Sequence, residues 1–271
     1  MDWKSYLANT DVIVHCGGLS ERWYPITKGK IPKPLTEIGK KKRPMLDWIL
    51  LPYVKMGVRK FFITMWNDPE AVMKRCEEIK EKTGIEFVYL IESDRRMGKA
   101  GVVKHYLQKG VLDKNRHKLN VNAADLVNFD IKVFINFHIS NGFLATMMGS
   151  KTGETQFDKL MLEKKTGRVL RMNDERTVSL PKNELANVGI GYFDAKLNNL
   201  FLKIPDNEFP ADWETSSISK EFFKVSRGYD GVESDVTWFP LKNPHDYRKV
   251  KEMDLEKWFN IKSADEYLGR Y

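Results

Sequence analysis

The sequence has very little cysteine, no long apolar run and no zinc-finger spacing of cysteine and histidine. Its two cysteines, Cys16 and Cys76, stand far apart, so neither a disulfide framework nor a thiolate metal cluster is expected. No apolar stretch approaches the roughly 18 residues that suggest a membrane span. The first six residues carry an acid and no apolar core, so no secretory signal is expected. These absences favour a protein of the reducing cytoplasm without a membrane partner.

Composition describes a globular chain, because 42% of the 271 residues are hydrophobic and 30% are charged. The net charge of +8 leaves three interpretations open: a nucleic-acid-binding face, a solvated basic surface, or a cleft for small anionic substrates. The longest basic cluster, residues 40–43, lies between Gly39 and Pro44 and is typical of a solvated loop. No RNA-binding motif with interleaved aromatic residues accompanies it, so no nucleic-acid partner is expected.

Hydrophobic patterning predicts alternating strands and helices along the first half of the chain. The expected strands there are 11–16, 61–65, 87–91, 119–122 and 143–148, and the expected helices are 44–56, 68–84, 100–109 and 130–142. Such strand–helix–strand units predict a mainly parallel sheet covered on both faces. The second half is less regular, with short strands at 159–162, 169–172 and 188–193 and helices at 244–250 and 258–268. We predict one domain over residues 1–252 and a C-terminal helical tail over residues 253–271.

The most informative motif follows the first predicted strand. It reads G-G-L-S-E-R-W-Y-P-I-T from Gly17 to Thr27, and P-K-P-L follows around Lys33. A triphosphate needs backbone N–H groups close to its oxygens, and glycine lets the chain approach without a Cβ. It also needs fixed cations, which Arg22 supplies as a planar fork and Lys33 as a point charge. The motif is neither the dinucleotide fingerprint nor a P-loop.

The motif resembles the signature G-G-x-[GS]-[TE]-R-x-x-P-x-T…P-K-P of the sugar-1-phosphate nucleotidyltransferases. The resemblance implies an α/β fold: a three-layer α/β/α sandwich, the Rossmann-like nucleotide-diphospho-sugar transferase fold, with a mainly parallel mixed sheet. It implies an enzyme that transfers NMP from an NTP to a sugar 1-phosphate, forming an NDP-sugar and releasing pyrophosphate. By the same resemblance, Gly17, Gly18 and Leu19 bind the nucleotide. Arg22 and Lys33 are implied as catalytic residues that hold the reacting phosphates.

The similarity extends over roughly residues 10 to 252. Glu92 and Gly98 match the segment E…G-T-A-G near the base and sugar, although Lys99 stands where threonine is usual. The motifs E-K-P and N-x-G-[IV] imply four sugar-binding residues, Glu175, Arg176, Asn187 and Gly189. The segment from Trp238 to Tyr247 is similar to W-x-D-I-G-T-P-x-D-Y.

Two departures concern the metal that the resemblance implies. The family holds Mg²⁺ with an aspartate in N-G-D and a second one in W-x-D. The first segment places its acid, Asp125, one position late, and Pro240 stands at the second aspartate. We predict Mg²⁺ as the cofactor, with Asp125 and Asp235 as its ligands, since one or two carboxylates with substrate phosphates and water are enough.

The reaction needs no general base, because the second pKa of a phosphate monoester is about 6 and its oxygen is already ionised. The protein then has to position the two substrates and to neutralise the charge of the reacting phosphates. Two functions stay open: an active nucleotidyltransferase whose partners are an NTP and a sugar 1-phosphate, or a nucleotide-sugar-binding regulatory homologue with an impaired metal site. Assembly into a homo-oligomer also stays open.

Overall fold

The computed structural model describes residues 2–66, 68–92, 95–151, 158–173, 184–231 and 236–271. The chain forms two compact units, each assembled from three separate segments. Unit 1 comprises Met1–Ile13, Asp94–Val121 and Lys132–Val236. Unit 2 comprises Val14–Ser93, Asn122–Ile131 and Thr237–Tyr271. Strand β1 contributes residues to both units.

Unit 1 is a mixed sheet with helices. Its strand order is β10-β9-β11-β6-β1, and β8 pairs with both β11 and β12. The strands are β1 (Thr10–His15), β6 (His117–Asn122), β8 (Ala145–Ser150), β9 (Lys159–Leu162), β10 (Val169–Asn173), β11 (Glu184–Phe193) and β12 (Ser226–Asp230). The helices are α1 (Trp3–Ala8), α5 (Lys99–Gln108), α6 (Ile131–Asn141), the 3₁₀ turn η3 (Ala195–Leu197), α7 (Asn198–Phe201) and α8 (Ser219–Lys224). Strand β11 is antiparallel to β6, β8 and β9, whereas β12 is parallel to β8.

Unit 2 continues from β1 through two further strands in the order β1-β4-β5, of which β4 and β5 are parallel. These strands are β4 (Lys60–Met65) and β5 (Glu86–Ile91), and two antiparallel pairs are formed by β2 (Glu37–Ile38) with β3 (Arg43–Pro44) and β7 (Asp125–Asn128) with β13 (Thr237–Pro240). The helices are η1 (Glu21–Trp23), α2 (Tyr24–Thr27), η2 (Lys33–Leu35), α3 (Met45–Lys55), α4 (Pro69–Thr83), α9 (Pro244–Val250), α10 (Leu255–Trp258) and α11 (Asp265–Leu268). This α/β arrangement of a mixed sheet with helices confirms the predicted fold class.

Helix α4 shows how local sequence sets an element. It begins at Pro69 and ends at Gly84, which adopts the left-handed conformation at φ +70° that glycine tolerates best. Its stripe of Val72, Cys76 and Ile79 is buried, as the spacing predicts. Asp68 stands at the N-cap position, but it is left-handed and its side chain makes no capping hydrogen bond.

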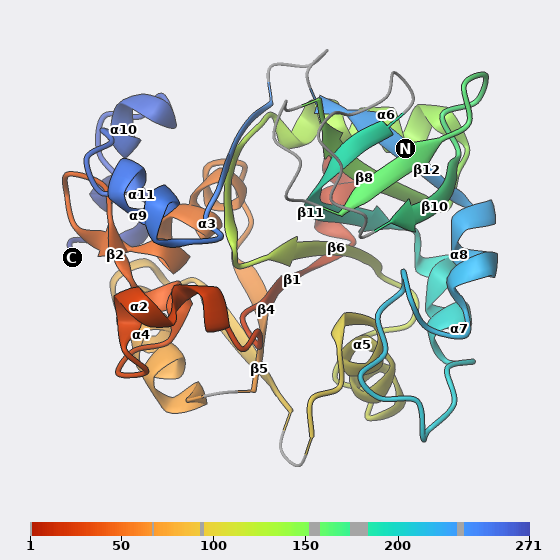
Figure 1. The fold of residues 1–271 in the computed structure, drawn as a ribbon, viewed down its shortest axis with the longest axis horizontal. Helices are drawn as coiled ribbons and strands as arrows, with labels where there is room; N and C mark the ends of the chain where they lie inside the picture. Colours follow the sequence, from red (N-terminus) through yellow and green to blue (C-terminus); the bar gives the residue numbers. More distant parts are fainter. Residues whose placement is uncertain (1, 67, 93–94, 152–157, 174–183, 232–235) are drawn as a thin grey trace. The chain divides into compact units, whose positions relative to one another are not determined.

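The C-terminal segment forms two short helices, α10 and α11, where one helix over residues 258–268 was expected. Asn260 adopts φ +51° between them, which breaks the helical path. Figure 1 shows α11 near α3 within unit 2, and these two helices are in contact.

Between α11 and α3 lies a buried ion-pair network. The Arg43 guanidinium lies 3.3 Å from Asp47 and 2.8 Å from Asp265 on α11. Asp47 is fully buried and also accepts from Arg75 at 2.5 Å and 3.0 Å. Within unit 2, ion pairs as well as packing therefore hold the C-terminal helix α11 against α3.

No helix in the described part of the chain is long and apolar enough to cross a membrane. The division into residues 1–252 and 253–271 stays a prediction, and the described tail lies within unit 2.

Candidate functional site

The predicted phosphate loop leaves β1 and turns sharply at Ser20. This residue adopts the left-handed conformation at φ +55°, and its carbonyl accepts from the Trp23 N–H at 2.7 Å to begin η1. Trp23 anchors the loop, because its ring is buried and its Nε1–H donates to the Thr36 hydroxyl at 3.0 Å. Leu19 and Arg22, in contrast, are exposed. The loop therefore presents Leu19 and Arg22 to solvent from a fixed base.

The first glycine of the loop lies directly against Glu92. A Cβ added to Gly17 would meet Glu92 Oε1 at 2.6 Å, closer than real Cβ contacts come. A Cβ on Gly18 would meet nothing within 4 Å. The structure thus brings together Gly17 and Glu92, two of the residues predicted to bind the nucleotide. The two glycines differ, because a Cβ at Gly17 would displace the carboxylate of Glu92, whereas a Cβ at Gly18 would displace nothing.

Lys33 points inward beneath the loop. Its ammonium donates to the Leu241 carbonyl and, at 3.4 Å, to the Ala124 carbonyl, and it lies 4.8 Å from the centre of the Trp23 ring. Burial, and then the positive charge of Lys242, lower its pKa from 10.5 to about 7. Arg22 adds to this lowering, so the two predicted catalytic cations lie within each other's electric field.

Asp125 is the first residue of β7 and is almost fully buried. Its Oδ2 forms an ion pair with Lys242 Nζ at 2.8 Å. Its Oδ1 is buried and has no hydrogen-bond partner in the described part of the chain. Pro240, at the second metal position of the family motif, is the direct cross-strand partner of Asp125 in the β13–β7 ladder.

The segment that carries Lys242 is held rigidly. Asn243 caps α9 in a capping box with Asp246. The Asp246 carboxylate accepts from the backbone N–H of Lys242 at 2.8 Å and from that of Asn243 at 3.1 Å. Tyr247 on α9 meets the Trp23 ring edge to face, with centroids 5.8 Å apart. The backbone that positions Lys242 therefore has few degrees of freedom.

In unit 1, Gly98 belongs to a tight backbone approach. It adopts φ +76°, and a Cβ here would lie 2.6 Å from the Ala211 carbonyl oxygen. The following Lys99 forms an ion pair with the buried Glu214 at 2.6 Å, and its backbone N–H donates to Asp212. A structural need for glycine therefore explains Gly98, whose nucleotide contact stays a prediction.

Asn187 and Gly189 lie in an irregular stretch of β11 in unit 1. The Asn187 Oδ1 accepts from the Gly189 N–H at 3.0 Å, and Gly189 adopts φ +82°. The N-x-G motif therefore makes a local turn, and its role in sugar binding stays a prediction. Glu175, Arg176 and Asp235 lie outside the described residues.

The described residues alone do not complete a protein-held Mg²⁺ site, because the second predicted ligand, Asp235, lies outside them. Of the two predicted ligands, Asp125 is already compensated by an ammonium ion. Among the described residues, no group of three or more His, Cys, Asp or Glu side chains could hold a metal ion. Asp125 as a metal ligand stays a prediction, but its surroundings in the described part of unit 2 argue against it.

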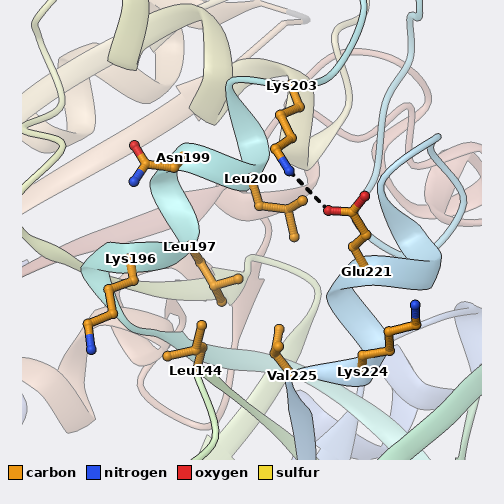
Figure 2. A pocket seen from close by; sticks show the side chains of 9 residues that line it. All are labelled: Leu144, Lys196, Leu197, Asn199, Leu200, Lys203, Glu221, Lys224 and Val225. Carbon is orange, nitrogen blue, oxygen red and sulfur yellow. Dashed lines mark hydrogen bonds and ion pairs between the residues drawn. The ribbon is translucent and has the colours of Figure 1, made fainter.

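A separate pocket of about 370 Å³ lies within unit 1 (Figure 2). It is lined by Leu144, Lys196, Leu197, Asn199, Leu200, Lys203, Glu221, Lys224 and Val225. Lys203 and Glu221 form an exposed ion pair of 3.2 Å across its rim. None of the predicted site residues lines this pocket, so it is distinct from the phosphate loop.

The family model described as nucleotidyl transferase matches residues 11–256. The chain belongs to the nucleotidyl transferase family. Relatives of this family include the mannose-1-phosphate guanyltransferase of Gibberella zeae, 29% identical over 52% of this chain and 38% of that protein. Another is the bifunctional protein GlmU of Methanococcus vannielii, 24% identical over 87% of this chain and 53% of that protein. The chain thus spans about half or less of the length of these relatives.

Solved structures of the same fold include HddC from Yersinia pseudotuberculosis, alone and complexed with GMP-PN. Both are 18% identical to this chain, cover 92% of it and 99% of HddC, and have TM-scores of 0.71 and 0.68. The family assignment confirms the resemblance that the phosphate loop indicates.

Sequence reasoning missed Lys242. The signal was present, because this lysine stands at the glycine of the motif W-x-D-I-G-T-P, two positions after Pro240. Within three residues, this nucleotidyl transferase therefore has a proline in place of the motif's aspartate and a lysine in place of its glycine.

Proposed function

We propose that this nucleotidyl transferase moves NMP from an NTP to a sugar 1-phosphate, forming an NDP-sugar and releasing pyrophosphate. The observation that carries the proposal is the arrangement of cations at the glycine loop. Arg22, Lys33 and Lys242 all belong to unit 2, and the charges of Arg22 and Lys242 both act on Lys33. Fixed cations beside a loop whose Gly18 leaves open space suit a triphosphate.

The reaction requires the protein to position the two substrates and to neutralise the negative charge of their phosphate groups. An oxygen of the sugar 1-phosphate attacks the α-phosphorus of the NTP, and the bond from that phosphorus to the oxygen bridging to the β-phosphate breaks. The bonding electrons leave with pyrophosphate. The attacking oxygen is already ionised, since the second pKa of a phosphate monoester is about 6. Arg22 holds the leaving pyrophosphate, and Lys33 contacts the oxygens around the reacting phosphorus.

Mg²⁺ stays a prediction for this reaction, and no step is assigned to it. Of the two residues predicted to hold the ion, Asp125 is paired with Lys242, and Asp235 lies outside the described residues. The fixed cations of the protein supply the charge that the proposed chemistry requires.

The relatives suggest the first substrates to test. One is a mannose-1-phosphate guanyltransferase, and HddC has been crystallised with GMP-PN. GTP with mannose 1-phosphate is therefore the first pair in a pyrophosphate-release screen of all NTPs against a panel of sugar 1-phosphates, with and without Mg²⁺. A pair that releases pyrophosphate and yields the matching NDP-sugar supports the proposal, provided that Arg22→Ala abolishes the signal. No release with any pair would reject it.

A regulatory homologue that binds nucleotide sugars without turning them over is the second candidate. The Asp125–Lys242 pair favours it, because the family's metal position is altered. Saturable binding of an NDP-sugar together with no pyrophosphate release in the same screen would select this function.

A further inference from the structure

We propose that the Lys242 ammonium takes the place of a divalent cation at Asp125, so that the free protein holds no metal ion there and meets phosphate groups with fixed cations. The metal-binding half of this inference concerns the ligand-free protein. The phosphate half rests on the proposed function.

The ion pair itself is the first argument. Lys242 Nζ lies 2.8 Å from Asp125 Oδ2, and the two side chains are 19% and 2% exposed. A buried carboxylate needs a compensating charge. Asp125 Oδ1 has no hydrogen-bond partner in the described part of unit 2, so Lys242 is the ion-pair partner of this carboxylate, and Lys33 also lies within its electric field.

The described residues of the β13–β7 ladder offer no second carboxylate beside Asp125. Pro240 faces Asp125 in the ladder and offers no side-chain ligand. The nearby Asp246 is committed to two backbone N–H groups, at 2.8 Å and 3.1 Å. Mg²⁺ is commonly held by one or two carboxylates together with substrate phosphates and water. In the ligand-free protein, the described part of this ladder supplies one carboxylate, which already has a partner.

The local charge is the third argument. Lys242 and Arg22 are both close enough to Lys33 to lower its pKa. A divalent cation placed at Asp125 would meet the Lys242 ammonium at contact distance, and like charges repel strongly in a partly buried site. An anionic phosphate would instead be attracted by Arg22 and by protonated Lys33, while Lys242 keeps the negative charge of Asp125 from repelling it.

Metal binding to the ligand-free protein is the direct test. Mn²⁺ is titrated into the protein, and binding is followed as the loss of the electron paramagnetic resonance signal of free Mn²⁺. We expect no site in the wild type tighter than about 1 mM, since one paired carboxylate is a poor ligand set. The double variant Pro240→Asp with Lys242→Gly restores both motif residues. It should bind Mn²⁺ at least about tenfold more tightly than the wild type, and adding Asp125→Asn should remove that gain.

Phosphate binding is the second test, with inorganic tripolyphosphate as the probe because the base is not identified. Calorimetry in EDTA should show binding to the wild type. Excess Mg²⁺ should not strengthen that binding, because Mg²⁺ complexes tripolyphosphate and lowers its negative charge. Lys242→Met should weaken that binding about tenfold or more. The matched control Lys249→Met removes the same charge from an exposed position on α9, and it should leave the affinity for tripolyphosphate unchanged.

Wild-type Mn²⁺ binding that Asp125→Asn abolishes would overturn the inference. So would a folded double variant that gains no Mn²⁺ affinity, or tripolyphosphate binding that requires Mg²⁺. A melting curve on each variant confirms that it is folded. Failure of the proposed function has a different signature, which is normal results in these titrations with no pyrophosphate release from any substrate pair.

Discussion

Replacing Lys33 with methionine removes a buried ammonium whose pKa is lowered from 10.5 to about 7. The unfolded chain keeps the ordinary value, so between these two pH values it binds more protons than the folded chain. The free energy of unfolding of the wild type therefore rises with pH across this window. Below about pH 7 both states are protonated, and the penalty is constant.

The size of the effect follows from the shift. A change of about 3.5 pKa units corresponds to about 5 kcal/mol when Lys33 is fully charged in both states, at roughly 1.4 kcal/mol for each unit. At pH 7 about 4 kcal/mol of this penalty applies, and at pH 9.5 about 1 to 1.5 kcal/mol is left. The wild type should therefore gain about 3 kcal/mol more than Lys33→Met between these two pH values.

Urea unfolding of both proteins at pH 7.0 and pH 9.5 measures this difference directly. The contributions of the other titrating groups, which are the same in both proteins, cancel in this comparison. It is also unaffected by hydrogen bonds to the Leu241 and Ala124 carbonyls that are lost equally at both pH values. If the free energy of unfolding changed equally with pH in the two proteins, the interpretation of Lys33 as a buried ammonium with a lowered pKa would be refuted. A bound phosphate should raise the pKa of Lys33 again, so tripolyphosphate binding near pH 8 should take up a proton, which calorimetry in two buffers can detect.

Four other substitutions test further features of unit 2. Gly17→Ala should displace the Glu92 carboxylate, which a Cβ would meet at 2.6 Å, and weaken nucleotide binding with a small loss of stability, whereas Gly18→Ala should leave the melting temperature unchanged and weaken nucleotide binding. Arg22→Ala should lower kcat/KM by about 100-fold or more without changing stability, because the exposed guanidinium acts on phosphates. Arg43→Met should lower the free energy of unfolding by about 3 kcal/mol in urea, since it leaves a buried carboxylate short of a partner.

Local signals in the sequence determined much of the framework. Apolar runs predicted β1, β4 and β5. In β1 and β4 nearly every residue is buried, as expected for a strand covered on both faces. Gly84 predicted the end of α4 through its left-handed conformation. The glycine pair with Arg22 predicted the phosphate loop and led to the family, since that chemistry depends on residue types at close spacing.

Pairing between distant segments was decided by tertiary structure. Strands β7 and β13 are each four residues long and have no pattern of their own, so only their pairing defines them. That pairing sets Pro240 opposite Asp125 and brings Lys242 to the same carboxylate, 117 positions along the chain. The sequence marked Asp125 as a metal ligand because it records residue types and spacing. The folded chain fills that carboxylate's surroundings with an ammonium ion, because charge compensation in a buried site depends on which side chains meet there.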